Sequence, residues 1–297
     1  MKRWWIYQKE RFPLLAHGPL IAAFSACAVS FSSLIGNAPA PGWEMYLTAF
    51  VVCLLLFLQL RIADEFKDAE EDARWRPYRP VPRGLVKLSE LRLVFILAAG
   101  AQLGLVLWLD LRLLWVLGIA WTYLALMSVE FFARDWLKAR PVVYLVSHMG
   151  IMPLVDFFGT ACEWLPRAGT APDGLEWFLA ASFFNGIVIE VGRKLRQHAD
   201  EEEGVETYSK LWGRAGASAV WLAMLAMTLL CAVMAAKAIH FIAPVAIGLG
   251  AMLALAIVVI LRYLRCALSG KSIEAVSGVW TLALYLLLGL VPLWLHT

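Results

Sequence analysis

Charge is scarce in this chain: only 16% of its 297 residues are Asp, Glu, Lys or Arg. Soluble domains carry about 25% charged residues, so the composition excludes a soluble globular protein. The five cysteines stand singly, with no CxxC motif and no grouping with histidine, which excludes a disulfide framework and a zinc site. A cleavage motif of small residues is also missing after the first apolar run, so we expect the first hydrophobic segment to be retained.

Long apolar runs dominate what is present. Hydrophobic residues make up 61% of the chain, and its mean hydropathy is +0.71. A transmembrane helix needs about 20 mostly apolar residues. Nine segments meet this requirement: 12–35, 43–63, 90–109, 111–132, 141–165, 175–193, 215–239, 243–263 and 275–295. The sequence therefore predicts an all-α polytopic membrane protein, with nine spanning helices in a single domain over residues 1–297.

The lysines and arginines are distributed unevenly among the predicted connections. If the N-terminus is cytoplasmic, all but three of the 26 basic residues fall on the cytoplasmic side, the exceptions being Arg112, Arg167 and Lys237. This asymmetry follows the positive-inside rule and supports both the span count and the orientation. We expect a bacterial-type inner or plasma membrane location. The net charge of +3 follows from this topology, so we predict no nucleic-acid partner.

Two long charged connections, residues 61–89 and 190–214, are predicted to form a cytoplasmic polar cap. In the first, Asp64, Asp68 and Asp72 recur every four residues and share one face of a helix. Such carboxylates repel one another unless a cation neutralises them, and Mg²⁺ prefers a few hard oxygen ligands that leave room for water and phosphate. The acids follow LLLFLQLRIA without a polar spacer, where acids are costly and tend to be functional. The alternative is an ordinary solvated helix end.

The segment RWRPYRPVPRG, residues 74–84, follows these acids. Its prolines forbid a regular helix and favour an extended chain, so Arg74, Arg76, Arg79 and Arg83 are expected to project at fixed intervals. Arginine binds phosphate through two parallel hydrogen bonds. The segment is therefore a candidate anion site, and an ordinary basic cytoplasmic loop is the alternative.

The second charged connection begins with Glu190, Arg193, Lys194 and Arg196, which lie within two helical turns. Glu190 and Lys194 have the i, i+4 spacing of a helical ion pair. A second acidic run covers residues 200–203. A helix end paired by its own salt bridges would explain this segment, but acids and bases at both long connections favour a composite site for an anion and a metal.

Several polar residues within the predicted spans are candidates to touch an acceptor or a cation: Tyr123, Glu130, His148, Asp156 and Asn185. Burial of a carboxylate in a membrane is costly, so we interpret Glu130 and Asp156 as functional. His148 and Asn185 are expected to make hydrogen bonds between helices. Tyr123 belongs to a group of aromatic residues whose faces can stabilise positive charge, although packing is the alternative.

The stretch D-E-x-x-D-x-x-x-D at Asp64, Glu65, Asp68 and Asp72, followed by R-P-x-x-P-R-G from Arg79, resembles the UbiA superfamily of intramembrane prenyltransferases. That family's first motif is N-D-x-x-D-x-x-x-D, followed by R-P-[IL]-x-x-G-x-[IV]. Asp64 replaces the family's Asn and Glu65 its first Asp, whereas Asp68 and Asp72 match outright. The similarity extends over the whole chain, because the charged connections follow the second and sixth predicted spans. It implies a helical bundle around a central apolar cavity.

The second family motif, D-x-x-x-D, is less well matched. Asp200 stands where the later Asp belongs, and Arg196 lies nearest the earlier one, so we expect the basic residues here to contact diphosphate oxygens. The resemblance implies Mg²⁺ as cofactor, with the candidate ligands Asp64, Glu65, Asp68, Asp72, Asp200 and Glu201. It implies catalytic roles for Asp64, Asp68, Asp72 and Glu190. Residues implied to bind the diphosphate are Lys67, Arg74, Arg79, Arg83, Arg193, Lys194 and Arg196.

The reaction implied by the resemblance is loss of diphosphate from an isoprenyl diphosphate and transfer of the prenyl group to an aromatic or lipid acceptor in the bilayer, at a site facing the cytoplasm. Such a site must stabilise the leaving group and keep water from the carbocation. A UbiA-type terpene cyclase, acting on farnesyl or geranylgeranyl diphosphate without an acceptor, is the first alternative. An ion or lipid transporter is a second, but it predicts acids in the middle of spans rather than at one membrane face.

Overall fold

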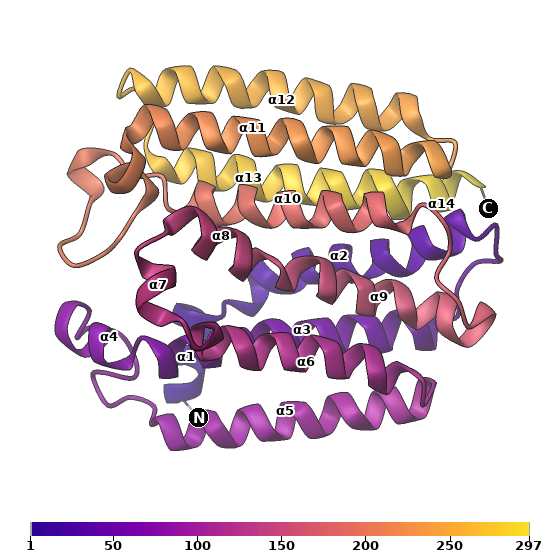
Figure 1. The fold of residues 1–297 in the computed structure, drawn as a ribbon, viewed down its shortest axis with the longest axis horizontal. Coiled ribbons are helices and arrows are strands. Elements are labelled where there is room, and N and C mark those ends of the chain that lie inside the picture. The colour runs from indigo at the N-terminus through magenta and orange to yellow at the C-terminus, as the bar shows by residue number, and fades with distance from the viewer. Residues whose placement is uncertain (1, 297) are drawn as a thin grey trace. The chain divides into compact units, whose positions relative to one another are not determined.

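The computed structural model describes residues 2–296, and it consists of helices and connections without a strand in that range. The predicted all-α class is therefore confirmed (Figure 1). Among the described residues, eight helices are long and apolar enough to cross a membrane: Leu14–Ile35, Trp43–Lys67, Leu88–Leu109, Pro141–Ala168, Leu175–Arg193, Tyr208–Ala238, Ile242–Leu264 and Gly270–Leu295. The segment predicted as the fourth span forms α6, Leu113–Ser128, with only 16 residues, so the count of nine stays a prediction.

Contacts between helices divide the chain into two compact units. The first comprises Met1–Val29 and Pro41–Thr170, and the second comprises Ser30–Ala40 and Ala171–Thr297. Helix α2, Leu14–Ile35, contributes its larger part to the first unit and its last turns to the second. Each unit has a polar end of its own.

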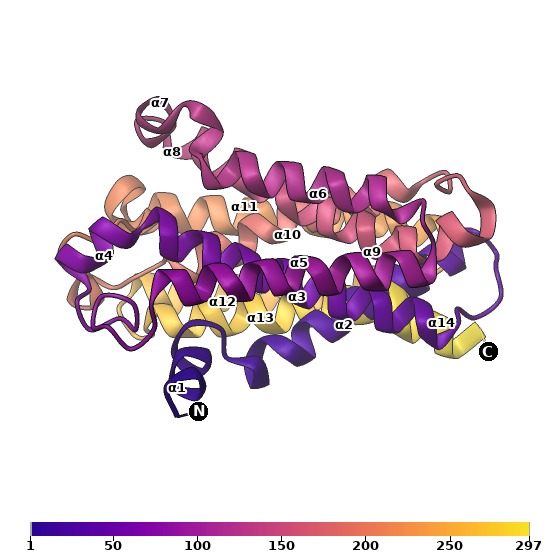
Figure 2. The ribbon, with the colours of Figure 1, turned by 90° about the horizontal axis from the view of Figure 1, so that it is seen from below.

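The first unit is built around α3, Trp43–Lys67, which packs against α5, Leu88–Leu109, and α9, Ile151–Ala168. Its other elements are α1 (Lys2–Arg11), α4 (Ala69–Trp75), α6, η1 (Glu130–Phe132), α7 (Arg134–Lys138) and α8 (Pro141–Met149). Figure 2 shows α4 and α7 at the same end of this unit. The span predicted over residues 141–165 is divided at Gly150 into α8 and α9.

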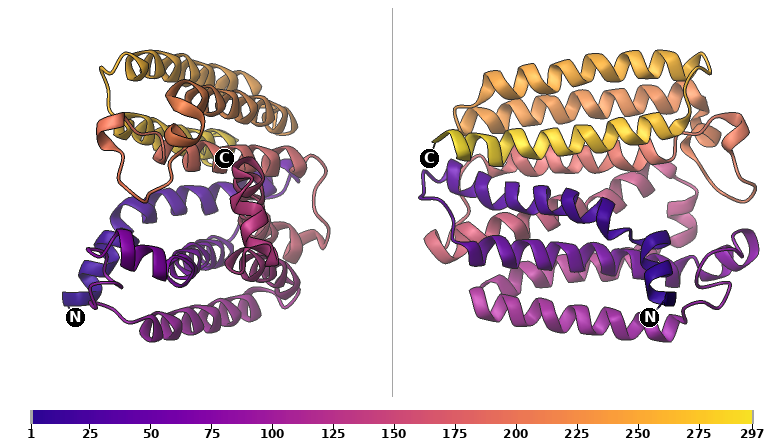
Figure 3. Two further views of the ribbon diagram at one scale, coloured as in Figure 1. Left: turned by 60° about the vertical axis from the view of Figure 1, so that its left-hand side comes forward. Right: turned by 180° about the vertical axis from the view of Figure 1, so that it is seen from behind.

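Helix α1 is folded onto the first unit. Tyr7 is buried in an apolar cluster with Ile62, Val86 and Leu91, which come from α3, the loop before α5, and α5 itself. The Arg3 guanidinium lies 2.6 Å from Glu90 at the start of α5. This helix lies at the end of the unit that carries α4 (Figure 3, right). The basic N-terminal residues, which were informative only about orientation in the sequence, are therefore part of the packed structure.

The second unit contains four long helices: α10 (Leu175–Arg193), α11 (Tyr208–Ala238), α12 (Ile242–Leu264) and α13 (Gly270–Tyr285). Each packs on its neighbour in the chain, and α13 returns to pack on α10. The short elements η2 (His198–Asp200), η3 (Leu286–Leu290) and α14 (Val291–His296) complete the unit. Figure 1 shows α10 to α13 side by side.

Two glycines allow close approach in the second unit. A Cβ atom at Gly192 would lie 2.2 Å from the Ser277 Oγ of α13, so α10 reaches its neighbours only because a side chain is missing there. At Gly270, the first residue of α13, a Cβ atom would lie 1.9 Å from the carbonyl oxygen of Leu195. The chain that follows α10 is thus packed directly on the backbone at the start of α13.

Candidate functional site

The acidic segment of the first unit is interrupted at Asp68. Helix α3 ends at Lys67 and α4 begins at Ala69, while Asp68 has φ −96° and ψ 7°. The predicted ladder of three aspartates on one continuous helix is therefore interrupted at its second member, although the Asp72 amide still donates to the Asp68 carbonyl oxygen at 2.8 Å. Asp64 and Asp68 remain together at the end of α3, and Asp72 lies in α4.

Asp64 and Asp68 form the more open part of the segment. The Asp64 side chain is 40% exposed, and its oxygens lie 3.6 Å from Arg61 Nη1 and 3.9 Å from Lys67 Nζ. Partial burial and the negative charge of Asp64 raise the pKa of Asp68 above its ordinary value, although Lys67 opposes the shift. A carboxyl group whose ionised form is disfavoured by a neighbouring carboxylate is a suitable place for a cation.

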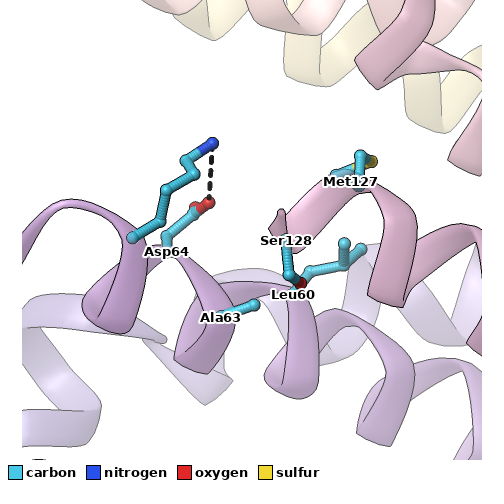
Figure 4. Close-up of a pocket in the computed structure, with 6 residues that line it drawn as sticks. Leu60, Ala63, Asp64, Met127 and Ser128 are labelled. Carbon is cyan, nitrogen blue, oxygen red and sulfur yellow. Dashed lines mark ion pairs between the residues drawn. The ribbon is translucent and has the colours of Figure 1, made fainter. Parts of the chain in front are cut away.

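A small pocket lies beside Asp64. Leu60, Ala63 and Asp64 of α3 line it together with Met127 and Ser128 at the end of α6 (Figure 4). Its volume of about 10 Å³ is that of a single water molecule. Two of the residues that line this pocket, Met127 and Ser128, belong to α6, so the end of α6 borders Asp64.

Asp72 is buried and bound by arginine on both oxygens. Arg76 Nε lies 3.0 Å from one oxygen, and Arg79 Nη1 donates to the other at 2.7 Å. Only 2% of the side chain is exposed. Asp72 therefore anchors the proline-rich loop that follows α4, and its carboxylate is already neutralised without a metal.

The four arginines of residues 74–84 do not form the predicted row, and the first of them, Arg74, lies within α4. Two of them hold Asp72, whereas Arg83 pairs with Glu10 of α1 at 2.9 Å and donates to the Tyr78 carbonyl oxygen. The Arg74 guanidinium stacks on the ring of Trp75, 4.9 Å from its centroid. Their partners lie in different directions, so the loop is a folded structure rather than an extended basic strand.

Glu65 is separated from Asp64 and Asp68 although it lies between them in the sequence. Its side chain is 1% exposed and accepts a hydrogen bond from Arg11 Nε of α1. The residue thus joins α3 to α1. Its predicted role as a metal ligand gains no support from this geometry, because the carboxylate is buried against another helix.

A second polar group surrounds Lys67 at the end of α3. The Lys67 ammonium donates to the Tyr144 hydroxyl at 2.9 Å and lies 3.3 Å from Glu130 Oε1. The Tyr144 hydroxyl donates to the same Glu130 oxygen at 3.2 Å, and His148 Nε2 lies 3.1 Å from Glu130 Oε2. The structure therefore brings together Lys67, Glu130 and His148, three residues singled out in the sequence, through Tyr144, which was not.

The remaining candidates of the predicted spans have packing contacts. The Tyr123 hydroxyl donates to the Ser147 carbonyl oxygen at 2.6 Å and connects α6 to α8. Asn185 of α10 accepts a hydrogen bond from the Thr281 hydroxyl of α13 at 3.2 Å, as expected for an interhelical contact. Asp156 is fully buried on α9, the helix that packs on α3 and α6.

In the second unit, the end of α10 carries its own ion pairs. Glu190 lies 2.5 Å from Arg193 and 2.9 Å from Lys194. Beyond it, Glu201 accepts hydrogen bonds from the Thr207 hydroxyl, the shorter at 2.7 Å, and lies 3.8 Å from Lys210, while the Asp200 side chain is exposed. Glu190 is thus placed with the basic residues, whereas the two predicted metal ligands of this connection lie within its own loop.

An open pocket of about 1150 Å³ lies at the same end of the second unit. Arg196 and Arg214 line it together with Cys266, and the Arg196 amide donates to the Ser209 hydroxyl at 2.8 Å. Gln197 donates to the carbonyl oxygens of Tyr263 and Leu268, both at 2.8 Å. These bonds tie the chain after α10 to the connection between α12 and α13.

Asp64 and Asp68 fit a metal ion that is also bound by substrate phosphate. Within residues 2–296, no three His, Cys, Asp or Glu side chains gather closely enough to hold an ion by themselves. Mg²⁺, however, is usually held by one or two carboxylates, with water and substrate phosphate completing its octahedron. Asp64 and Asp68, with the raised pKa of Asp68, suit that arrangement. Glu65, Asp72 and Glu201 do not, since their oxygens already bind other side chains.

Sequence reasoning missed Tyr144, which bridges Lys67 and Glu130. The signal in the sequence is its i, i+4 spacing to His148. In the structure the two rings stack at a centroid distance of 3.9 Å. A tyrosine at the start of a predicted span is ordinarily an interfacial anchor, so composition alone does not single it out.

Comparisons with known proteins agree with this arrangement of helices. The model of the UbiA prenyltransferase family matches residues 23–273. The fold is similar to the apo structure of a UbiA homolog from Aeropyrum pernix K1, with a TM-score of 0.69 and 15% sequence identity over 93% of this chain and 97% of that one. At that identity the likeness concerns the fold alone. A search of curated proteins found no match.

Proposed function

Because the chain belongs to the UbiA prenyltransferase family, we propose that it is a Mg²⁺-dependent intramembrane enzyme that cleaves an isoprenyl diphosphate and transfers the prenyl group to an aromatic or lipid acceptor. One observation carries the proposal beyond family membership. Asp64 and Asp68 lie side by side at the end of a spanning helix, next to the Lys67 ammonium, and the pKa of Asp68 is raised. Two neighbouring carboxylates can hold a metal ion, and the adjacent ammonium can contact the anion that the metal binds.

The proposed chemistry is the departure of diphosphate, which leaves an allylic carbocation on the prenyl chain. When bound, Mg²⁺ supplies positive charge to the diphosphate oxygens. Asp64 and Asp68 are the residues that would hold it, and Lys67 would contact the anion directly. The Lys67 ammonium would oppose the negative charge that develops on the leaving group, and the two carboxylates would act on it only through the cation that they hold.

We assign a diphosphate-binding role to Arg193 and Lys194 as well. Their partner Glu190 lies within 2.9 Å of each, so both side chains are held at the end of α10. Basic residues here replace a carboxylate of the family pattern, and they can bind phosphate oxygens without a metal. We propose that the active site faces the cytoplasm, which the uneven distribution of lysine and arginine supports.

The test is release of diphosphate from isoprenyl diphosphates of several chain lengths by the purified protein. Release should require Mg²⁺, and Asp68→Ala should lower its rate by about 100-fold or more, the cost of removing one group that stabilises transition-state charge. Glu70→Ala is the matched control, since Glu70 is exposed on the same segment. If Asp68→Ala released diphosphate at the wild-type rate, with folding verified by thermal unfolding, the proposed metal site would be rejected.

Terpene cyclisation is the second candidate, favoured by the basic character of the end of α10, which departs from the usual acidic motif. Incubation with farnesyl or geranylgeranyl diphosphate and Mg²⁺, without an acceptor, separates the two. A cyclic hydrocarbon product would identify a cyclase. Diphosphate release that depends on an added acceptor would identify a transferase.

A further inference from the structure

The Lys67 ammonium is held by groups from three different elements. It donates to the Tyr144 hydroxyl of α8 at 2.9 Å, lies 3.3 Å from Glu130 Oε1 of η1, and lies 3.9 Å from Asp64 Oδ1 of α3. Its side chain is only 15% exposed. A largely buried ammonium is costly unless it is paired, and the carboxylates of Glu130 and Asp64 provide that pairing here.

Glu130 is in turn fixed at both of its oxygens. The Tyr144 hydroxyl donates to Oε1 at 3.2 Å, and His148 Nε2 lies 3.1 Å from Oε2. His148 Nδ1 lies 2.9 Å from the Tyr144 carbonyl oxygen, which can only accept a hydrogen bond, so Nε2 carries a proton for Glu130 in the imidazolium form alone. The Tyr144 hydroxyl and the Lys67 ammonium therefore restrain the Glu130 carboxylate in either form of the histidine.

The backbone around Glu130 adopts an unfavourable conformation. Glu130, Phe131 and Phe132 have φ angles of 51°, 51° and 59°, three consecutive non-glycine residues in the left-handed region. Each such residue is energetically unfavourable, because its Cβ atom approaches the following carbonyl oxygen. Strain of this kind persists only where the surroundings over-determine it, and it concentrates at functional sites. Here the turn reverses the chain after α6 and directs a buried carboxylate to the end of α3.

We propose that Glu130 is a positioning residue that holds the Lys67 ammonium beside Asp64 and Asp68 for contact with diphosphate oxygens. His148 and Tyr144 hold Glu130 in turn. The inference rests on the proposed function, since it concerns the same anion. Its physical basis is preorganisation: a lysine fixed before the ligand arrives loses less side-chain entropy on binding.

The test is a double-mutant cycle on the affinity for inorganic pyrophosphate with Mg²⁺, measured by calorimetry on the purified full chain in detergent. Lys67→Met should weaken binding about tenfold, as loss of a charge-assisted contact predicts. Glu130→Gln should also weaken binding about tenfold in the wild-type background but less than twofold when Lys67→Met is already present. Glu71→Gln, which changes a carboxylate paired with Lys138 instead, should leave binding unchanged.

An equal loss from Glu130→Gln in both backgrounds would overturn the inference, because Glu130 would then act independently of Lys67. Tighter binding by Glu130→Gln would overturn it too, since it would mean that the carboxylate only repels the anion. If Glu130→Gln does not fold, Glu130→Asp takes its place. We then expect a smaller loss of pyrophosphate affinity, which should again diminish when Lys67→Met is present. Absence of pyrophosphate binding by the wild type would reject the proposed function itself, whereas a failed cycle alone leaves that function standing.

Discussion

At the scale of single residues, the acids at the end of α3 have different environments and hence different roles. Asp64 is 40% exposed and lies near cations at distances that leave room for a ligand. Asp72 is buried with an arginine at each oxygen. Removing one partner of a buried ion pair costs about 3–5 kcal/mol, because the remaining charges lose their neutralisation. Asp72 is therefore expected to matter for the order of its loop.

Asp72→Asn should open the loop after α4, because Arg76 and Arg79 lose the charge that holds them. Limited trypsin digestion measures this at the bond after Arg83, since Arg76 and Arg79 precede prolines and resist the enzyme. We expect cleavage about tenfold faster or more, in line with the cost of breaking a buried pair. The exposed neighbour variant Glu70→Gln should digest like the wild type. Equal rates for Asp72→Asn and wild type would show that other contacts hold the loop.

The sequence predicts this acidic segment well and the division within it poorly. Four-residue spacing identifies Asp64 and Asp68 as neighbours, since that depends on the helix alone. Glu65 and Asp72 are bound by Arg11 and Arg79 instead. Helical periodicity contains no information on Arg11, 54 positions away, or on the fold of the proline-rich loop that returns Arg79 to Asp72.

At the scale of elements, the left-handed turn η1 is the least expected feature. The sequence predicts an uninterrupted span through residue 132, whereas α6 ends at Ser128 and the turn follows. Glycine is the residue that normally signals such a conformation, and η1 contains none. The tertiary contacts of Glu130 with Lys67 and His148 favour this turn, and the sequence around η1 contains no local signal for them.

Strain in η1 is testable at Phe132, whose side chain is 84% exposed. Phe132→Gly and Phe132→Ala both remove the ring, but only glycine adopts a φ of 59° without cost. The glycine variant should therefore be more stable than the alanine variant by about 1 kcal/mol, or a few degrees in the thermal unfolding midpoint. Identical midpoints for the two variants would show that the turn is unstrained at this position.

Helices α4 and α7 are joined by a surface ion pair that responds to pH. Lys138 Nζ lies 2.6 Å from Glu71 Oε1, and this hydrogen bond lowers the pKa of Glu71 below its usual value of 4.5. A carboxyl group with a lowered folded-state pKa adds stability above its usual pKa and loses it as the pH falls through the lowered value. Both side chains are 45% exposed, so the pair contributes at most about 1 kcal/mol.

The thermal unfolding midpoint of the wild type should exceed that of Glu71→Gln by about 1–3 °C at pH 7. The difference should diminish below pH 4.5 as Glu71 becomes protonated, and it should be smaller in high salt. A difference that persists unchanged at strongly acidic pH would assign the effect of the substitution to something other than charge.

At the scale of the whole molecule, the length of the apolar segments predicts the membrane-spanning helices most reliably. Eight helices of the described residues match predicted spans, because hydropathy over about 20 residues reports directly on burial in a bilayer. The exception, α6, is shortened to 16 residues by the turn that follows it. Family membership agrees with the motif read in the sequence, although Glu65 and the basic end of α10 depart from that motif.

The orientation of the chain can be tested with its cysteines. Cys266 is exposed, whereas Cys27, Cys53, Cys162 and Cys231 are buried. Since residues 262–271 are predicted to be cytoplasmic, a membrane-impermeant maleimide should label the protein in inside-out vesicles and leave it unlabelled in right-side-out vesicles. Cys266→Ser should abolish the labelling. Modification in right-side-out vesicles alone would reverse the predicted topology.

The contact between Gly270 and the Leu195 carbonyl oxygen has a mechanical consequence. With no side chain between them and Gln197 bonded to Tyr263 and Leu268, the connection from α12 to α13 and the tail of α10 cannot shift independently. The backbone that leaves Arg193 and Lys194 is therefore anchored within two residues of Lys194, so a substitution at Gly270 would disturb the end of α10 although it contacts neither cation.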